Sequence, residues 1–434
     1  MRQFDDHCFG ALLMSLWWKR RVPGRRWLVA AVWASAVTVA VLQTWAALRR
    51  PFVDRLSDLQ VYLGAVNDLW NGDGLYDFAA EATGAPFTYP PFAGLLFAPL
   101  ALPPFAVIAV IWSVATFAVV VAVAVAAVRR SEFRATGTPW LTPLFALALF
   151  ASSPISSNFR FGQISVFLVA AVLADVLRLV PERYRGILTG VACAVKLTPL
   201  VFVPYFWFSG QRRAAVTSVA AFVACTGIAW LVLPDESVRF WFTEIWNVNR
   251  VGNIETGGNQ SLNGALLRWG LPDLIRSSVV AVVGSAIVVL ALIRATRAYR
   301  NDQPLAAAVL VGAAGLVFSP VSWTHHQVWL LLAALLAVSA RPRWSLLWPA
   351  VVLVVMILPV TSRGASLPGG FLLGDARLWL AVAVAVFIPF VAVRRVPAES
   401  PVEAGTAQPT VEPMHPPAQR DGIAETEGAG RPER

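Results

Sequence analysis

Long apolar segments recur along this chain, and they constrain its fold more than any other feature of the sequence. Examples are Trp27 to Leu48, Phe105 to Val128, Ala214 to Leu233 and Leu305 to Phe318. A helix needs about 20 apolar residues to cross the hydrocarbon core of a bilayer. The segments do not alternate apolar and polar residues, which argues against a transmembrane β-barrel. The sequence therefore predicts an all-α, polytopic membrane protein with about 10–13 transmembrane helices.

Composition supports this class and excludes others. The chain has 434 residues, of which 57% are hydrophobic and only 14% are charged, whereas a soluble domain carries about 25% charged residues. The net charge of +10 does not indicate nucleic-acid binding, because most Lys and Arg residues lie in clusters at the ends of apolar segments. Cys8, Cys193 and Cys225 lack metal-type spacing, and two lie in apolar segments, so we expect no zinc site or disulfide framework. No cleavable signal peptide is expected, since Phe9 to Trp18 precedes the first basic cluster instead of following it.

The basic clusters orient the predicted helices, because Lys and Arg collect in cytoplasmic loops. Residues 1–26 end in such a cluster, and we assign them to a cytoplasmic N-terminus. Residues 27–395 form the predicted transmembrane domain. Residues 396–434, rich in Pro, Glu, Ala, Gly and Thr, are predicted to be a disordered cytoplasmic tail. Five stretches then fall outside the cell: residues 49–88, 153–163, 234–273, 319–326 and 361–375.

Two apolar segments do not fit simple spans. The segment from Phe92 to Val128 is long enough for two helices and is divided by Leu102-Pro103-Pro104, yet its flanking charges require an odd number of crossings. The segment from Gly186 to Phe208 has basic clusters at both ends and contains Pro199 and Pro204. Proline permits broken or re-entrant helices. We therefore expect the second segment to be interrupted.

The first predicted outside loop contains Asp58 within a helical pattern. Asp58, Val61, Tyr62, Ala65 and Leu69 repeat at helical spacing, which predicts an interfacial helix holding the Asp58 carboxylate near the membrane surface. Alternatively, Asp58 is an N-cap, a position that favours Ser and Asp. The spacing alone leaves both interpretations open.

Two of the four histidines, His325 and His326, lie together at the end of an apolar segment. Such a pair could bind a metal, transfer a proton or hold a phosphate. No neighbouring Cys or carboxylate has the spacing of a zinc site. The alternative is that the two rings anchor a helix end at the membrane surface, the role expected of Trp323 and Trp329.

Lys196 lies within an apolar segment, where an ionisable side chain is expensive and therefore indicates function. Its partner could be an anionic head group, and Pro199 nearby favours a broken helix that opens a cavity. The alternative is that Lys196 extends to the membrane surface.

Other polar side chains collect in two predicted outside loops. Residues 156–163 include Arg160 and Gln163, and the loop at residues 234–273 includes Arg250, Asn259 and Gln260. Amide, guanidinium and aromatic side chains suit sugar hydroxyl groups. They are equally common in solvated loops, so these residues alone do not identify a substrate.

Taken together, several motifs resemble one family. They are Asp58-Leu59-x-Val61-Tyr62, Leu75-Tyr76-Asp77, Phe87-Thr88-Tyr89-Pro90-Pro91-Phe92, Gly162-Gln163-Ile164, Lys196-Leu197-Thr198-Pro199, Asn259-Gln260-Ser261 and Ser319-Pro320-Val321-Ser322-Trp323-Thr324-His325-His326. This set resembles the polyprenol-phosphate-mannose-dependent α-1,2-mannosyltransferases of actinobacteria, which are transferases of glycosyltransferase family 87 with the C-type fold and extracytoplasmic loops. The resemblance runs from about Asp58 to His326. Ser165 departs from it, because the family often has Asn at that place.

The resemblance implies a polyprenyl-phosphate mannose donor, a lipid-anchored mannoside acceptor such as a phosphatidylinositol mannoside or lipomannan, and an α-1,2 product. A β-linked donor and an α-linked product require inversion, for which one carboxylate suffices as the base. That role falls to Asp58. The leaving phosphate needs charge stabilisation, for which His325, His326 and Lys196 are the candidates, with Arg160 also expected at the donor phosphate. The remaining substrate-binding candidates are Tyr62, Tyr89, Gln163, Arg250, Asn259, Gln260 and Trp323.

The same resemblance places the active site on the extracytoplasmic side of the plasma membrane. It implies no metal, no nucleotide cofactor and no nucleic-acid partner. Other functions remain open: a different lipid-linked sugar transferase, such as an arabinofuranosyltransferase, or a transporter of lipid-linked sugars. Transporters usually place paired ionisable groups at mid-membrane, whereas here the carboxylates are concentrated in predicted outside loops. A scaffold would not need the Asp, His and Lys residues.

Overall fold

The structure, a computed structural model, describes residues 25–81, 83–133, 138–338, 342–366 and 370–391, and these residues are mainly helical. The predicted cytoplasmic tail and nearly all of the predicted N-terminal segment lie outside the described residues. The first half of the described chain contains α2 (Arg25–Leu48), α3 (Ser57–Asn71), α4 (Pro91–Phe97), α5 (Phe105–Arg130), α6 (Leu141–Ala151), α7 (Ser153–Phe161), α8 (Ser165–Val176), α9 (Ile187–Val195), α10 (Phe202–Phe208) and α11 (Arg212–Val232). The second half contains α12 (Pro234–Phe242), α13 (Leu262–Arg268), α14 (Asp273–Val279), α15 (Ser285–Arg300), α16 (Pro304–Phe318), α17 (Val328–Leu332), α18 (Pro342–Ile357), α19 (Val360–Gly364), α20 (Gly370–Gly374) and α21 (Ala376–Val382).

Four described helices are long and apolar enough to cross a membrane: Arg26–Leu48, Phe105–Arg130, Arg212–Val232 and Asp273–Arg300. Large apolar side chains on them are exposed, as at Leu231, which is 85% exposed. Such surfaces are stable in lipid and would associate in water. The all-α membrane fold is thus confirmed. Shorter apolar helices accompany the four, and the expected total of about 10–13 crossings stays a prediction.

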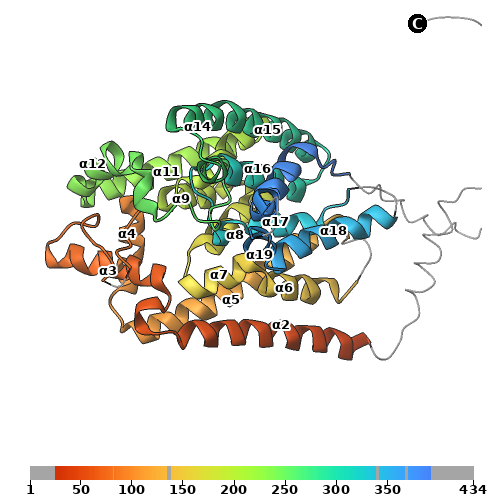
Figure 1. Cartoon of the computed structure of the whole chain (residues 1–434), viewed down its shortest axis with the longest axis horizontal. Coiled ribbons are helices and arrows are strands. Elements are labelled where there is room, and N and C mark those ends of the chain that lie inside the picture. Colours follow the sequence, from red (N-terminus) through yellow and green to blue (C-terminus); the bar gives the residue numbers. More distant parts are fainter. Residues whose placement is uncertain (1–24, 82, 134–137, 339–341, 367–369, 392–434) are drawn as a thin grey trace, which may run out of the picture. The chain divides into compact units, whose positions relative to one another are not determined.

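Helix α16 forms the centre of the described core. Nearly all of its side chains are buried, and it packs against α8, α15, α17 and α21. A helix that is apolar on every side is stable only when protein or lipid surrounds it completely. This explains why the segment from Leu305 to Phe318 is uniformly apolar although it is shorter than a typical span. Figure 1 shows α15 lying alongside α16.

Both proline-containing segments are divided as predicted. Helix α4 and the 3-10 turn η2 (Ala98–Leu100) precede Pro103-Pro104, after which α5 begins at Phe105. The second segment divides into α9, the 3-10 turn η5 (Thr198–Val201) and α10. Lys196 ends α9 in an extended conformation, with φ −153° and ψ 130°. This break turns the Lys196 side chain into a cavity.

Short helices position the loop residues. Helix α3 packs against α4 and α7, and α12 packs against α4 and α11. The 3-10 turn η9 (Thr324–His326) packs against α7 and α8. Segments from four stretches predicted to lie outside the membrane therefore meet near the break between α9 and η5.

Candidate active site

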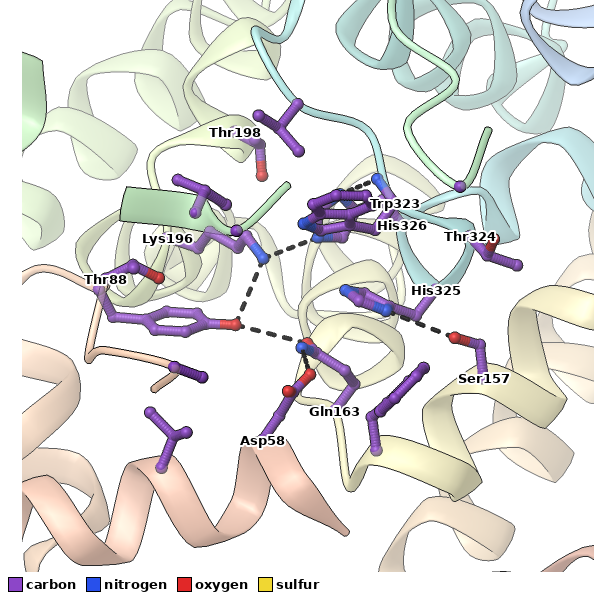
Figure 2. Close-up of a pocket in the computed structure, with 18 of the residues that line it drawn as sticks. Asp58, Thr88, Ser157, Gln163, Lys196, Thr198, Trp323, Thr324, His325 and His326 are labelled. Atoms are coloured by element: carbon purple, nitrogen blue, oxygen red, sulfur yellow. Dashed lines mark hydrogen bonds between the residues drawn. The ribbon is translucent and has the colours of Figure 1, made fainter. Parts of the chain in front are cut away.

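A cavity of about 1260 Å³ opens where these segments meet. Its wall includes almost every site residue predicted from the sequence. Figure 2 shows several of them converging on the same space from different elements. The predicted site residues in the wall are Asp58, Tyr62, Tyr89, Arg160, Gln163, Lys196, Arg250, Trp323, His325 and His326.

Asp58 lies in the first turn of α3 and projects into the cavity (Figure 2). The α3 helix begins after Leu56, which has a left-handed conformation and makes no side-chain cap bond. The N-cap interpretation of Asp58 is therefore wrong. The carboxylate oxygen Oδ2 of Asp58 instead accepts a hydrogen bond from the Gln163 amide Nε2.

Gly162 allows this contact between α3 and the end of α7. It ends α7 in the left-handed region, with φ 66°, which Gly adopts without strain. A Cβ atom at this position would lie 2.8 Å from the Cβ of Leu59 and 3.1 Å from the Cβ of Leu56. Only a glycine lets the chain pass this close to α3 and place Gln163 beside Asp58.

The orientation of the Gln163 amide is fixed by two hydroxyl groups. Its Oε1 accepts hydrogen bonds from the Tyr89 hydroxyl at 3.4 Å and from Ser165 Oγ at 3.2 Å. Its Nε2 group is thereby directed at the Asp58 carboxylate. Ser165, the residue that departs from the family pattern, thus has a definite role here: it orients Gln163.

Burial raises the pKa of Asp58 to about 6, although the Gln163 hydrogen bond offsets part of this increase. A carboxyl group with this pKa is ionised at neutral pH. It is also more basic than an ordinary aspartate, which suits proton removal from a hydroxyl group.

Tyr89, supported by Tyr62, links Gln163, the partner of Asp58, with Lys196. The hydroxyl groups of Tyr62 and Tyr89 lie 2.9 Å apart, and the Tyr62 ring stacks on Phe97 with a centroid separation of 4.5 Å. The Lys196 Nζ lies 3.4 Å from the Tyr89 hydroxyl and 4.9 Å from the centroid of its ring. Tyr89 therefore holds the amino group over the same cavity as the carboxylate.

Lys196 also forms a hydrogen bond with His326. Lys196 Nζ lies 2.8 Å from His326 Nε2, although the two residues are 130 positions apart in the chain. The other ring nitrogen of His326, Nδ1, accepts a hydrogen bond from the backbone N–H of Trp323 at 3.1 Å. Burial lowers the pKa of His326 well below its usual value, so the ring is neutral.

His325 lies beside His326, with ring centroids 4.5 Å apart. Its Nδ1 is 3.4 Å from Ser157 Oγ, and its buried Nε2 has no hydrogen-bond partner among the described residues. Asn158 fixes this turn, because its Nδ2 donates to the His325 carbonyl oxygen at 3.1 Å. The free Nε2 of a buried ring in a cavity wall is a candidate contact for a substrate.

Arg160 lines the same cavity but is not part of the Lys196 pair. Its guanidinium lies over the Phe161 ring, 4.8 Å from the centroid, while the bonds of Lys196 run to Tyr89 and His326. Arg160 and Lys196 therefore share no partner in these contacts, and the assignment of both to one phosphate stays a prediction.

Ion pairs that were not predicted from the sequence form one edge of the cavity. Glu244 accepts hydrogen bonds from Arg239 Nε at 2.9 Å and Arg250 Nη1 at 2.8 Å. Arg239 also pairs with Asp77 at 2.7 Å, and Arg250 Nη2 donates to the Tyr76 carbonyl oxygen at 2.8 Å. These bonds tie the segment after α12 to the first predicted outside loop. No helical or strand periodicity links these positions, so sequence patterns could not reveal the network.

Asn259 and Gln260 lie behind the cavity wall. The Asn259 Oδ1 accepts from the backbone N–H of Ser322 at 2.9 Å, and its Nδ2 donates to the Ile254 carbonyl oxygen at 3.0 Å. Gln260 Nε2 donates to the carbonyl oxygen of Gly374 at 2.8 Å. The Asn259 side chain and the Gln260 backbone N–H, which donates to the Ser322 carbonyl oxygen at 2.9 Å, hold the segment that leads into Trp323 and η9. Direct contact between these side chains and a substrate stays a prediction.

Metal-binding chemistry has little support in the described part of the chain. No group of three or more His, Cys, Asp or Glu side chains is arranged there to hold a metal ion. Cys193 and Cys225 are free. The expectation of a reaction without a resident metal stays a prediction.

The site geometry can be compared with known proteins. The model for glycosyltransferase family 87 matches residues 87–320. A polyprenol-phosphate-mannose-dependent α-(1-2)-phosphatidylinositol mannoside mannosyltransferase of Mycolicibacterium smegmatis is 34% identical over 381 residues, covering 79% of this chain and 83% of that protein. A polyprenol-phosphate-mannose-dependent α-(1-2)-phosphatidylinositol pentamannoside mannosyltransferase of Mycobacterium tuberculosis is 37% identical over 325 residues, covering 72% and 73%.

No solved structure matches the chain significantly. The match to the family model and the identity to these relatives confirm the family resemblance. With its apolar helices and a cavity whose wall includes Asp58, Lys196 and His326, the chain is a membrane glycosyltransferase that belongs to glycosyltransferase family 87.

Proposed function

We propose that this enzyme transfers mannose from polyprenyl-phosphate mannose to a lipid-anchored mannoside, forming an α-1,2 linkage with inversion. The relatives named above, phosphatidylinositol mannoside mannosyltransferases that depend on polyprenol-phosphate mannose, support this donor and this class of acceptor. One observation carries the proposal. The Asp58 carboxylate, oriented by Gln163, faces the same cavity as the Lys196–His326 pair.

Asp58 is the proposed general base. Asp58 and Glu244 are the carboxylates among the described residues of the cavity wall, and Glu244 is neutralised by two arginines. Asp58 would take the proton of the acceptor hydroxyl as its oxygen attacks the anomeric carbon and the bond to the phosphate oxygen breaks. With a single free carboxylate, direct displacement and therefore inversion is the simplest course.

The polyprenyl phosphate leaves as a stable anion, so it needs positive charge and hydrogen-bond donors more than an acid. Lys196 and His326 are the proposed donors to its oxygens, and the unpartnered Nε2 of His325 is a third. Arg160 could neutralise the same phosphate or the phosphate of a glycophospholipid acceptor. The proposed reaction uses no resident metal or nucleotide.

The proposed site faces the extracytoplasmic side of the plasma membrane. Apart from Lys196 and Tyr89, the predicted site residues in the cavity wall come from stretches that the distribution of Lys and Arg assigns to the outside. A donor and an acceptor that are both lipid-linked could reach this cavity from the outer leaflet.

Replacement of the base tests the proposal. Asp58→Asn keeps the size of the side chain but removes the base, and general-base catalysis contributes about 10²–10⁴-fold to a rate. Membranes supplied with labelled polyprenyl-phosphate mannose should lose transfer by this factor, while Asp54→Asn, at a half-exposed carboxylate four positions earlier, should retain it. Retained turnover in Asp58→Asn would refute the assignment of the base. Transfer from a polyprenyl-phosphate arabinofuranose donor, without transfer from the mannose donor, would assign a different transferase.

A further inference from the structure

The hydrogen bonds of His326 fix which of its ring nitrogens carries the proton. The backbone N–H of Trp323 points at Nδ1 from 3.1 Å. A backbone N–H can only donate, so Nδ1 must present its lone pair. In a neutral imidazole the single proton then lies on Nε2. The opposite tautomer would direct two N–H groups at each other.

This tautomer determines the protonation state of Lys196. His326 Nε2 and Lys196 Nζ lie 2.8 Å apart, and Nε2 must be the donor. A lysine ammonium group has three donors and no acceptor, so only the neutral amine can complete this hydrogen bond. The amine retains two hydrogens, one of which donates to the Tyr89 hydroxyl at 3.4 Å. With Lys196 uncharged, each of these hydrogen bonds has one donor and one acceptor.

The turn that holds His326 leaves little freedom to rearrange. The His326 backbone N–H donates to the Trp323 carbonyl oxygen at 2.9 Å, which closes the turn. Just before it, the Ser322 N–H donates to Asn259 Oδ1 at 2.9 Å, and the Gln260 N–H donates to the Ser322 carbonyl oxygen at 2.9 Å. Asn259 and Gln260 thereby hold the backbone donor that selects the tautomer.

Partial burial of Lys196 also favours the neutral form, although the negative charge of Asp58 opposes it. The titratable groups that face it are Asp58, Tyr89, His325 and His326, and Asp58 is the one carboxylic acid among these. Lys196 forms no ion pair with a described carboxylate. A partly buried cation without a hydrogen-bonded counter-ion is disfavoured.

We propose that Lys196 is a neutral amine in the donor-free enzyme, held so by His326, and that it takes up one proton when the donor phosphodiester binds. The inference rests on the proposed function, which brings an anionic phosphodiester to this cavity. The proton comes from the solvent and ends on Lys196 Nζ. No bond of the lipid is made or broken, and the phosphodiester keeps its single negative charge.

In this account His326 is a positioning residue that acts through Lys196. When the donor arrives, the Nε2–H of His326 and the new ammonium group both turn to phosphate oxygens. The cationic charge thus appears only when its counter-ion is present. The donor-free enzyme avoids the free-energy penalty of a partly buried charge without a counter-ion.

The test is proton uptake during binding, measured by titration calorimetry with the purified full-length protein and no acceptor. Polyprenyl-phosphate mannose is titrated at pH 9 in buffers of different ionisation enthalpy, and the dependence of the heat on this enthalpy gives the protons taken up. We expect about one proton per lipid. Lys196→Arg, which is always charged, should bind the lipid with about no uptake. Asp58→Asn should retain the uptake of about one proton.

Three results would overturn the inference: binding to the native protein without proton uptake, loss of the uptake in Asp58→Asn, or full uptake in Lys196→Arg. A sugar-free polyprenyl methyl phosphodiester separates this inference from the proposed function. If this probe binds with one proton and the mannosyl lipid does not bind, the donor assignment fails and the inference stands. If neither lipid binds, both fail.

Discussion

Gly162 offers a test of how the site is assembled, through the change Gly162→Ala. An added Cβ has two consequences at this position. The left-handed backbone, with φ 66°, costs a non-glycine residue about 1–2 kcal/mol. The new methyl group also meets Leu59 Cβ at 2.8 Å and Leu56 Cβ at 3.1 Å, and such overpacking typically costs about 1–3 kcal/mol more.

The α7 end must move away from α3 to relieve these contacts, and this displaces Gln163 from Asp58. We therefore expect a lower thermal midpoint in detergent and a large loss of kcat/KM for sugar transfer. Gly210→Ala is the matched control, since Gly210 also has a left-handed backbone, with φ 87°, but no atom lies within 4 Å of its added Cβ. Gly210→Ala should lose only the stability that a left-handed backbone costs a non-glycine residue, and it should retain sugar transfer. Equal midpoints and equal activities in the two variants would refute the reasoning.

Two further predictions concern protonation and the ion pairs at the cavity edge. Because Asp58 has a pKa of about 6 and must be ionised to accept a proton, kcat/KM should fall as the pH drops below about 6, and a profile that stays flat to pH 5 would contradict this. Glu244→Gln leaves Arg239 and Arg250 without their shared, largely buried carboxylate, a loss of up to about 3–5 kcal/mol that should lower the thermal midpoint and raise KM. Glu255→Gln, at an exposed side chain, should change neither quantity.

Local sequence patterns predicted the helices well where one strong signal dominated. The apolar segment from Trp27 to Leu48 became α2, and the spacing around Asp58 became α3. Prolines located both interruptions, including the one that exposes Lys196. In each case the physical cause, apolar periodicity or the missing N–H of proline, is local and therefore visible in the sequence.

The contacts that define the site are not local. Gln163 meets Asp58 across 105 positions and His326 meets Lys196 across 130, so periodicity carries no information about them. The family resemblance assigned these residues to one site, but not their hydrogen bonds. It also could not separate Arg250, in the cavity wall, from Asn259 and Gln260, which support that wall from behind. Composition treats these polar residues alike, and only their tertiary partners distinguish them.

In the proposed function, the enzyme forms an α-1,2 mannosidic bond on a lipid-anchored mannoside. The most direct test of this proposal is product analysis, in which purified protein is incubated with polyprenyl-phosphate mannose and a panel of mannoside lipids. Methylation analysis of the products then gives the linkage. We predict a new α-1,2-linked mannose on at least one acceptor, formed by the native protein and by Asp54→Asn but not by Asp58→Asn. The absence of an α-1,2-linked product from every acceptor would contradict the account.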